Sequence, residues 1–200
     1  MTEVLGRKTS GNVQKVLFLL EELGAPYERA DYGRQFGNTT TPEYLEFNPN
    51  AKVPTVKVDG LVIWESNTVL RYLATKADYR FYSDDPGQRT QIERWMDWLL
   101  AALNPLYLYH FKEAKKPAAE RPADFAAQEK EMAALLSILD GALAGKAWIA
   151  GDDFTIADIA LGPIVKRCVA FPIDLPELPA LKAWLAKLEA RPAFKTATAG

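Results

Sequence analysis

Two short polar stretches carry side chains that could bind an anion. Ser10 and Asn12 lie in RKTSGN, directly before an apolar helical repeat, and the pair Glu65-Ser66 opens a second predicted helix. The first turn of a helix leaves backbone N–H groups without intrahelical partners and carries the positive end of the helix dipole. Both places therefore favour a carboxylate or a phosphate. A hydroxyl or amide donor beside the charge would strengthen the site.

The same side chains also fit a purely structural role. Serine and asparagine are common N-cap residues, so Ser10, Asn12 and Ser66 could each do no more than cap a helix. For Ser10 the two interpretations are equally open on sequence alone. At the second helix, Glu65 and Ser66 together could hold a zwitterion, with Ser66 on its carboxylate and Glu65 on its ammonium group.

Other catalytic chemistries have little support in the sequence. The segment around Ser10 does not match G-x-S-x-G, because Lys8 occupies the first glycine position. The single histidine, His110, disfavours a histidine-based triad or a histidine-rich metal site. The single cysteine, Cys168, excludes an internal disulfide and a C-x-x-C pair. We expect both residues to be buried packing groups, and we expect no metal site.

Thr155 and Asp158, in FTIADIAL, match the spacing of a capping box. In that motif each side chain satisfies a backbone N–H of the other residue's turn. We therefore expect Asp158 to be structural, with a loss of about 1 kcal/mol on replacement by alanine.

The first 76 residues alternate between strand and helix patterns. Apolar residues at helical spacing run from Val13 to Leu23, a short helical turn follows Pro42, and a third helix follows Glu65. The predicted strands are Glu3–Leu5, Tyr27–Tyr32, Val53–Val58 and Leu61–Trp64. The first strand–helix–strand segment predicts a parallel βαβ unit. Asp59-Gly60 between the last two strands predicts a type I′ hairpin.

After residue 76 the patterns are only helical. Predicted helices cover Gln88–Phe111, Ala123–Leu143, Thr155–Ala170 and Leu178–Leu188. A composition change near Ala77 and a Pro-Gly linker separate the two halves. We predict an α/β domain with the order β-α-β-α-β-β-α over residues 1–76, a linker over 77–87, and an all-helical domain over 88–200.

Composition limits the function classes. The chain has 48% apolar and 25% charged residues with a formal net charge of −2. This balance gives no electrostatic basis for binding nucleic acid or an anionic membrane. No apolar run has the length of a membrane span, and the N-terminus lacks the apolar region of a signal peptide. We expect a cytoplasmic protein.

Three longer motifs complete the sequence pattern. They are NPNAKVPTV at 48–56, WESNTVLRYLA at 64–74 and GDDFTIADIAL at 151–161. Together they resemble the cytosolic glutathione S-transferase family over essentially the whole chain, in particular its bacterial theta-like and Nu-like members. The resemblance implies a thioredoxin-like N-terminal domain, an all-helical C-terminal domain, a homodimer, and glutathione as co-substrate without a metal.

The resemblance also implies roles for individual residues. Val53, before a cis Pro54, would offer its main chain to the cysteinyl part of glutathione. The remaining glutathione contacts would come from Glu65 and Ser66 at the γ-glutamyl end, Lys52 at the glycyl carboxylate, and Gln35.

The thiol-activating group would be a serine or an asparagine. Ser10 falls at the position of the theta-like serine, and Asn12 resembles the asparagine of Nu-like members. No tyrosine or cysteine occupies the Ser10 position, which disfavours the chemistries of the tyrosine and cysteine classes. The thiolate would attack a small apolar electrophile bound between the domains, with Trp98 and Tyr107 as candidate pocket residues.

Two alternatives stay open. One is a glutathione-dependent disulfide reductase or peroxidase, which Asn12 is compatible with. The other is a non-catalytic interaction module of the same fold. The retained Lys52, Glu65 and Ser66 argue against the module, because a protein that no longer binds glutathione need not keep them.

Overall fold

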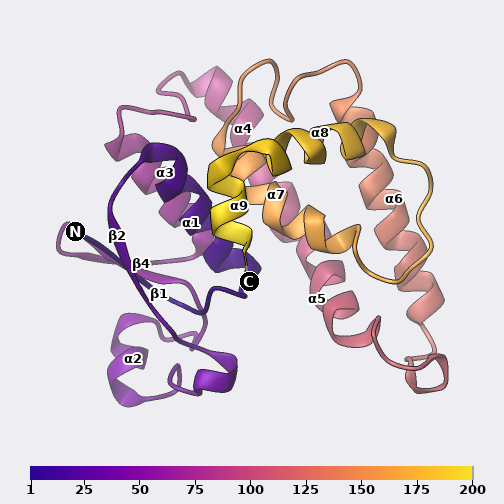
Figure 1. The fold of residues 1–200 in the computed structure, drawn as a ribbon, viewed down its shortest axis with the longest axis horizontal. Helices are drawn as coiled ribbons and strands as arrows, with labels where there is room; N and C mark the ends of the chain where they lie inside the picture. The colour runs from indigo at the N-terminus through magenta and orange to yellow at the C-terminus, as the bar shows by residue number, and fades with distance from the viewer. Residues whose placement is uncertain (200) are drawn as a thin grey trace. The chain divides into compact units, whose positions relative to one another are not determined.

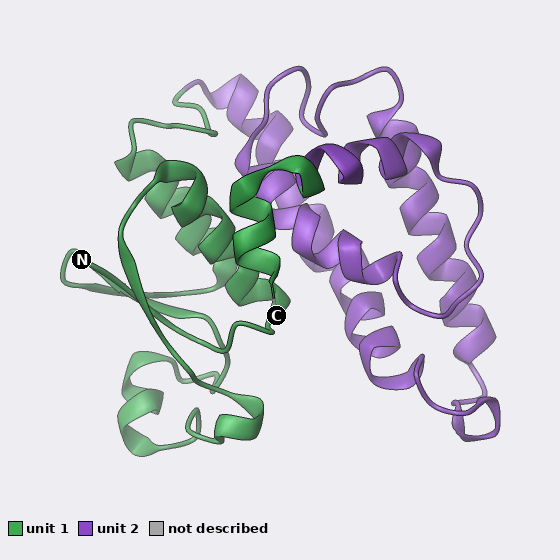
Figure 2. Cartoon of the chain, viewed as in Figure 1, with its two compact units in different colours: residues 1–84, 189–200 green, residues 85–188 purple. Residues whose placement is uncertain are grey.

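The computed structural model describes residues 1–199 in two compact units. One contains residues 1–84 together with the C-terminal residues from 189 onward, and the other contains residues 85–188 (Figure 2). Among the described residues, no helix is long and apolar enough to cross a membrane.

The first unit is built on one sheet with the strand order β2-β1-β3-β4. Its strands are β1 (Thr2–Leu5), β2 (Tyr27–Ala30), β3 (Thr55–Val58) and β4 (Leu61–Trp64). Strand β1 pairs in parallel with β2, and the β1–β3 and β3–β4 pairs are antiparallel. The predicted parallel βαβ unit and the following hairpin are therefore confirmed.

Helices cover both faces of this sheet. Figure 1 shows α1 (Gly11–Leu23) and α3 (Ser66–Lys76) side by side on one face and α2 (Pro42–Phe47) on the other. A short 3₁₀ turn, Arg34–Phe36, precedes α2. The order β-α-β-α-β-β-α agrees with the prediction. Helix α1 is buried on nearly all sides, so its apolar residues belong to the core of this unit.

Backbone conformation follows the turn residues. Gly24 ends α1 in the left-handed region at φ 62°, a conformation that costs glycine little. Asp59 and Gly60 both have positive φ, at 52° and 77°, which confirms the type I′ prediction. The Val53–Pro54 bond is cis, as the resemblance implied. Strand β3 begins only at Thr55, two residues later than predicted, after this cis bond.

A C-terminal helix that the sequence analysis did not predict completes the first unit. Helix α9 (Pro192–Thr198) packs against α1, with the rings of Phe18 and Phe194 edge to face at 5.1 Å. Arg191, at its N-cap, forms a two-pronged ion pair with Glu22 of α1, with N–O distances of 2.5 and 2.7 Å. Seven residues with one large apolar side chain are too short for a periodic signal, so tertiary contacts decide this helix.

The second unit is helical. Its helices are α4 (Pro86–Trp98), α5 (Asn104–Glu113), α6 (Phe125–Leu143), α7 (Ile156–Cys168) and the greater part of α8 (Pro179–Ala190), with a 3₁₀ turn at Ala118–Glu120. The predicted single helix Gln88–Phe111 was wrong: a π-helical segment, Leu99–Leu103, separates α4 from α5. Pro105 lies in the first turn of α5 and lacks the N–H that would continue the α-helical ladder.

The side chain of Asp158 joins three segments of the helical unit. Its Oδ2 accepts hydrogen bonds from the backbone N–H of Thr155 at 3.0 Å and from the Thr155 hydroxyl at 3.2 Å. Its Oδ1 accepts from the N–H of Ile149 at 3.0 Å and from Nε1 of Trp184 at 2.8 Å. The predicted capping box is confirmed. The two further bonds make Asp158 more than a cap.

We expect replacement of Asp158 by alanine to cost about 3 kcal/mol of unfolding free energy, more than a cap alone, because buried donors on Ile149 and Trp184 lose their acceptor. Urea unfolding of the full chain measures the loss. The exposed neighbour Asp153, replaced in the same way, provides the control and should change stability by less than about 0.5 kcal/mol. A loss near 1 kcal/mol for the Asp158 variant would reduce its role to capping.

Candidate functional site

Strand register brings the predicted site residues to one end of the sheet. Leu5, near the end of β1, lies opposite Ala30 of β2 and opposite Thr55 of β3, and Thr55 lies opposite Trp64 of β4. The loop after β1, the loop after β2, the residues before β3 and the start of α3 must therefore meet at this end. Ser10, Val53-Pro54 and Glu65-Ser66 all belong to these segments.

Close backbone approach holds the loops together. A Cβ atom built on Gly6 would lie 2.5 Å from Cγ2 of Val13 and 3.2 Å from Cβ of Val53. One on Gly33, whose φ is 84°, would lie 3.4 Å from Cγ1 of Val53. The loops after β1 and β2 thus both reach the residue before the cis proline, and glycine at each point permits the contact.

A buried polar network fixes the loop that carries Val53 and Pro54. The Tyr44 hydroxyl of α2 lies 2.7 Å from the carbonyl oxygen of Lys52 and 2.9 Å from the Thr55 hydroxyl. The side-chain amide of Asn48 donates to the same two oxygens at 2.9 and 3.1 Å. Because Tyr44 and Asn48 are buried, these hydrogen bonds fix the backbone on both sides of Val53 and Pro54.

At the N-terminus of α1, the structure argues against simple capping. Ser10 occupies the N-cap position and is 7% exposed, yet its side chain makes no capping hydrogen bond. Its hydroxyl can therefore serve another acceptor. Asn12 follows in the first turn of the same helix, so both polar groups lie at the positive end of the α1 dipole.

The N-terminus of α3 meets Asn12. The Ser66 hydroxyl donates to Oδ1 of Asn12 over 3.4 Å, so it joins the two helix starts and does not cap α3. Glu65 is the N-cap residue, with φ 68° and ψ 110°. A glutamate in this sparsely populated region is strained, and such strain is concentrated at binding sites. Ser10, Asn12, Glu65 and Ser66 together form what we call the two-helix anion site.

Two further predicted glutathione contacts, Gln35 and Lys52, are exposed residues of the loops next to the two-helix anion site. Gln35 is exposed within the 3₁₀ turn, and the Lys52 side chain is exposed while its carbonyl is held by the network above. Their roles stay predictions. Within residues 1–199, no group of three or more histidine, cysteine, aspartate or glutamate side chains is placed to hold a metal ion.

In the helical unit, Tyr107 and Trp98 lie among aromatic side chains. Tyr107 is buried and stacks on Phe171 at 6.2 Å, and its hydroxyl accepts from Arg167 over 3.4 Å. Trp98 packs edge to face on Trp95 at 5.5 Å. Their predicted place in a second-substrate pocket stays a prediction.

The single histidine and cysteine are buried, as expected. The Nδ1 atom of His110 lies 2.9 Å from the Leu106 carbonyl, and its ring stacks on Phe171. Cys168 is wholly buried, and burial raises the pKa of its thiol above the usual range, so this thiol is not a nucleophile at neutral pH.

Comparison with known proteins assigns the family. Residues 9–76 match the glutathione S-transferase N-terminal domain, and residues 94–192 match the corresponding C-terminal domain. The glutathione S-transferase GstB of Escherichia coli is 37% identical over 98% of this chain and 96% of its own length. The chain belongs to the glutathione S-transferase family. Its first unit therefore contains the thioredoxin-like domain together with the C-terminal helix α9, and its second unit contains most of the helical domain of that family.

Two further relatives of this transferase-family protein differ in their named activities. A theta-class glutathione S-transferase from Xanthomonas axonopodis pv. citri, solved with glutathione bound, is 37% identical with a TM-score of 0.92, and the match covers 100% of this chain and 97% of the other. The disulfide-bond oxidoreductase YfcG of Escherichia coli is 31% identical over 91% of this chain and 87% of its own.

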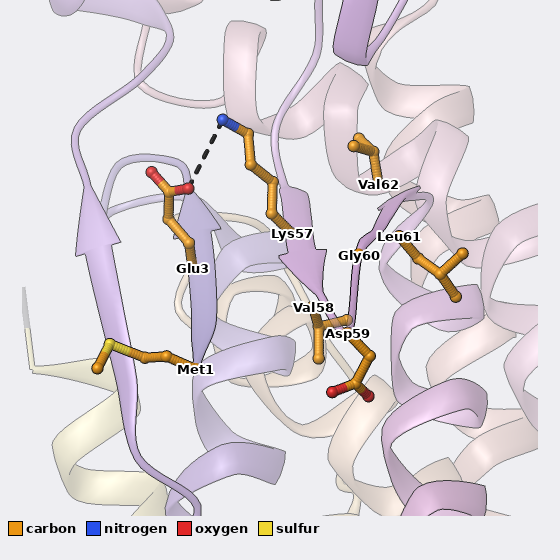
Figure 3. Close-up of a pocket in the computed structure, with 8 residues that line it drawn as sticks. All are labelled: Met1, Glu3, Lys57, Val58, Asp59, Gly60, Leu61 and Val62. Carbon is orange, nitrogen blue, oxygen red and sulfur yellow. Dashed lines mark ion pairs between the residues drawn. The ribbon is translucent and has the colours of Figure 1, made fainter.

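A surface cavity in the thioredoxin-like domain lies away from the two-helix anion site. Figure 3 shows it at the hairpin end of the sheet, with Met1, Asp59 and Leu61 among its lining residues. Glu3 and Lys57 form an ion pair there at 3.6 Å. The register places Glu3 opposite Lys57 and Leu5 opposite Thr55, so this cavity is at the other end of the strands.

One residue of this family member escaped the sequence analysis. Lys15, on α1, is 0% exposed, and its ammonium nitrogen has no hydrogen-bond partner within residues 1–199. Burial lowers the pKa of Lys15 to about 7, and the carboxylate of Glu65 acts in the opposite direction. The available signal was a single lysine inside a run of apolar residues from Val13 to Leu20.

We expect replacement of Lys15 by methionine to stabilise the ligand-free protein. The unfolded chain binds a proton at Lys15 between pH 7 and pH 10.5 that the folded chain does not, so the stability of the native protein rises across this window. The methionine variant lacks this dependence, and its advantage should be about 2–5 kcal/mol near or below pH 7 and shrink as the pH rises.

Urea unfolding of both proteins at several pH values measures the difference. Lys57, partly exposed and paired with Glu3, provides the control, since its replacement by methionine should give a small change that does not vary with pH in this way. A methionine variant at Lys15 that is less stable than the native chain at neutral pH would contradict the burial cost.

Proposed function

We propose that this protein is a glutathione transferase that holds glutathione at the two-helix anion site and activates its thiol as a thiolate. The observation that carries the proposal is the convergence of Ser10, Asn12 and Ser66 at one end of the sheet, beside the loop with cis Pro54. The theta-class relative with glutathione bound supports the same ligand.

Each part of glutathione has a matching group. The γ-glutamyl end is a zwitterion, for which Ser66 and the α3 N-terminus suit the carboxylate and Glu65 suits the ammonium group. The main chain of Val53 would pair with the cysteinyl residue. Lys52 and Gln35 would reach the glycyl end from the rim. In this proposed arrangement the thiol would lie near the N-terminus of α1.

Activation of the thiol requires stabilisation of its anion. A free thiol has a pKa of about 8.5, so it is mostly protonated at neutral pH. A hydrogen bond from Ser10 or from the Asn12 amide, with the positive end of α1 behind it, lowers that pKa. The thiolate sulfur then forms a bond to an electrophilic carbon of an apolar second substrate while the leaving group departs. Trp98 and Tyr107 are candidates for contacts to that substrate.

We expect replacement of Ser10 or Asn12 by alanine to raise the pKa of the bound thiol by about 1 unit, since a donor to the thiolate is lost. Thiolate absorbance of the glutathione complex, titrated with pH, measures the shift. Because Ser10 caps no N–H, its variant should keep its stability. Ser137, exposed on α6, offers a matched serine-to-alanine control that should leave the thiol pKa unchanged. An unchanged titration in both site variants would refute this assignment.

A second candidate activity is glutathione-dependent disulfide reduction. The 31% identity to YfcG and the presence of Asn12 favour it. The same thiolate would attack a disulfide sulfur and release the partner thiol. An activity panel with an aryl halide, a hydroperoxide and a glutathionyl disulfide distinguishes the reactions. Turnover of none of the three, in a sample that is retained on immobilised glutathione, would favour a non-catalytic module instead.

The partner and location are part of the proposal. We propose a cytoplasmic homodimer. Strand β4 lies at one edge of the described sheet, and Leu61, Val62 and Trp64 on it are 49%, 43% and 38% exposed. An exposed apolar edge strand is a surface that proteins normally cover. A second copy of the chain would cover it.

We expect light scattering to give a dimer mass for the native chain and a smaller mass for Val62→Lys, because a charge on the apolar edge must be desolvated in the interface. The control is Ile138→Lys, at an exposed apolar position of the helical unit, which should stay dimeric. A native chain that is monomeric at micromolar concentration, or a Val62 variant that dimerises normally, would remove this edge from the interface.

A further inference from the structure

Lys15 is a basic residue buried one helical turn from the two-helix anion site. It follows Asn12 by three positions on α1, so the two side chains lie on adjacent positions of one helix face. The Asn12 side chain accepts a hydrogen bond from Ser66 at the start of α3. The face that carries Lys15 is therefore turned towards the N-terminus of α3, where Glu65 and Ser66 lie.

Glu65 is the acidic group that acts on Lys15. The other charged side chains on elements packed against α1 are engaged elsewhere or partly exposed. They are Lys76 with Asp59, Arg191 with Glu22, Glu3 with Lys57, Arg29 with Asp31, Glu21 with the Tyr27 hydroxyl, and, partly or fully exposed, Arg7, Arg71 and Lys195. No second carboxylate among these is directed at Lys15.

A core position has no need of such a residue. A leucine or methionine would fill the space without the cost of removing an amine from water. The Nζ atom of Lys15 has no hydrogen-bond partner among residues 1–199. Such a buried basic group next to an anion site suggests that a counter-charge arrives with a ligand. Groups kept at a cost in stability are typical of binding and catalytic sites.

We propose that Lys15 is a positioning residue of the glutathione site, which takes up a proton when the γ-glutamyl carboxylate binds at the N-terminus of α3. The proposal rests on the glutathione-binding function proposed above and adds a proton to the binding reaction. The balance of charges between the ligand and the site favours this role of Lys15. The ligand ammonium is matched by Glu65, and its carboxylate, otherwise held by Ser66 and the helix dipole alone, gains the Lys15 ammonium.

The proton comes from the solvent. Above neutral pH, Lys15 is largely an uncharged amine in the ligand-free protein. A carboxylate held nearby in a region of low dielectric favours the ammonium form, and the Nζ atom accepts a proton from the buffer. No bond between heavy atoms forms or breaks in this step. Below neutral pH the ammonium is already present, so binding should take up almost no proton.

Isothermal titration calorimetry with S-methylglutathione tests this uptake on the full chain. This probe has no free thiol, so ionisation of the sulfur does not contribute to the proton count. Measurements are paired in HEPES and Tris at about pH 8, and in MES and imidazole at about pH 6. The number of protons bound follows from how the binding heat depends on the ionisation enthalpy of the buffer. Phosphate is avoided because it is itself an anion that can bind a helix N-terminus.

We expect the native chain to take up roughly 0.5–0.9 proton per ligand near pH 8 and close to none near pH 6, from a ligand-free pKa of about 7. Its dissociation constant should rise about fivefold per pH unit over the same alkaline range. Lys15→Met should bind more weakly and lose the uptake at both pH values. Lys57→Met, at the far end of the sheet, should behave like the native chain.

The outcomes separate the two proposals. Failure of S-methylglutathione to bind the native chain at either pH would overturn the proposed function. Binding with the same proton count near pH 6 and pH 8, or an uptake that persists in Lys15→Met, would overturn the role of Lys15 and leave the function intact. If the methionine variant does not fold, the native chain decides alone, because uptake only at the higher pH supports the proposal and its absence refutes it.

Discussion

The antiparallel pairing of β3 with β1 is the constraint on which the site depends. Because Leu5 lies opposite Thr55, the chain leaves β1 and enters β3 at the same end of the sheet. Strand β4 also ends there and leads into α3. Two helix N-termini therefore point to one place, each with N–H groups that have no partner within the helix itself. A shift of the register by one residue would turn β3 over and separate its loop from both helices.

This arrangement brings two helix N-termini and Lys15 close together, which creates a positive potential and lowers the stability of the fold. The site combines two helix dipoles, a strained Glu65 and a buried Lys15 whose Nζ has no hydrogen-bond partner among residues 1–199, none of which benefits the fold alone. The rest of the thioredoxin-like domain compensates through apolar packing of α1 and the polar network of Tyr44 and Asn48. The stability of the scaffold and the strain of the site are thus carried by different residues.

One cradle can serve more than one reaction. In the proposed site the groups that hold the peptide part of glutathione would be the same whether the sulfur attacks carbon or sulfur, and relatives of this chain do carry different activity names. In our proposal the reactions would differ in the donor that faces the thiolate and in the pocket for the second substrate. Ser10 and Asn12 are the candidates for the donor, and side chains of the helical unit are the candidates for the pocket.

The sequence by itself determined the order of elements in the first 76 residues, the hairpin turn and the cap at Thr155, and it supplied the candidate anion-binding residues, because these depend on local periodicity, turn chemistry and short motifs. It did not indicate the π-helical break before Asn104, helix α9 or Lys15. Whether Ser10 and Ser66 cap their helices was decided only by the tertiary structure, which directs the Ser66 hydroxyl to Asn12. Burial, hydrogen-bond choice and charge environment are properties of residues distant in the chain, and no local pattern records which of them will meet.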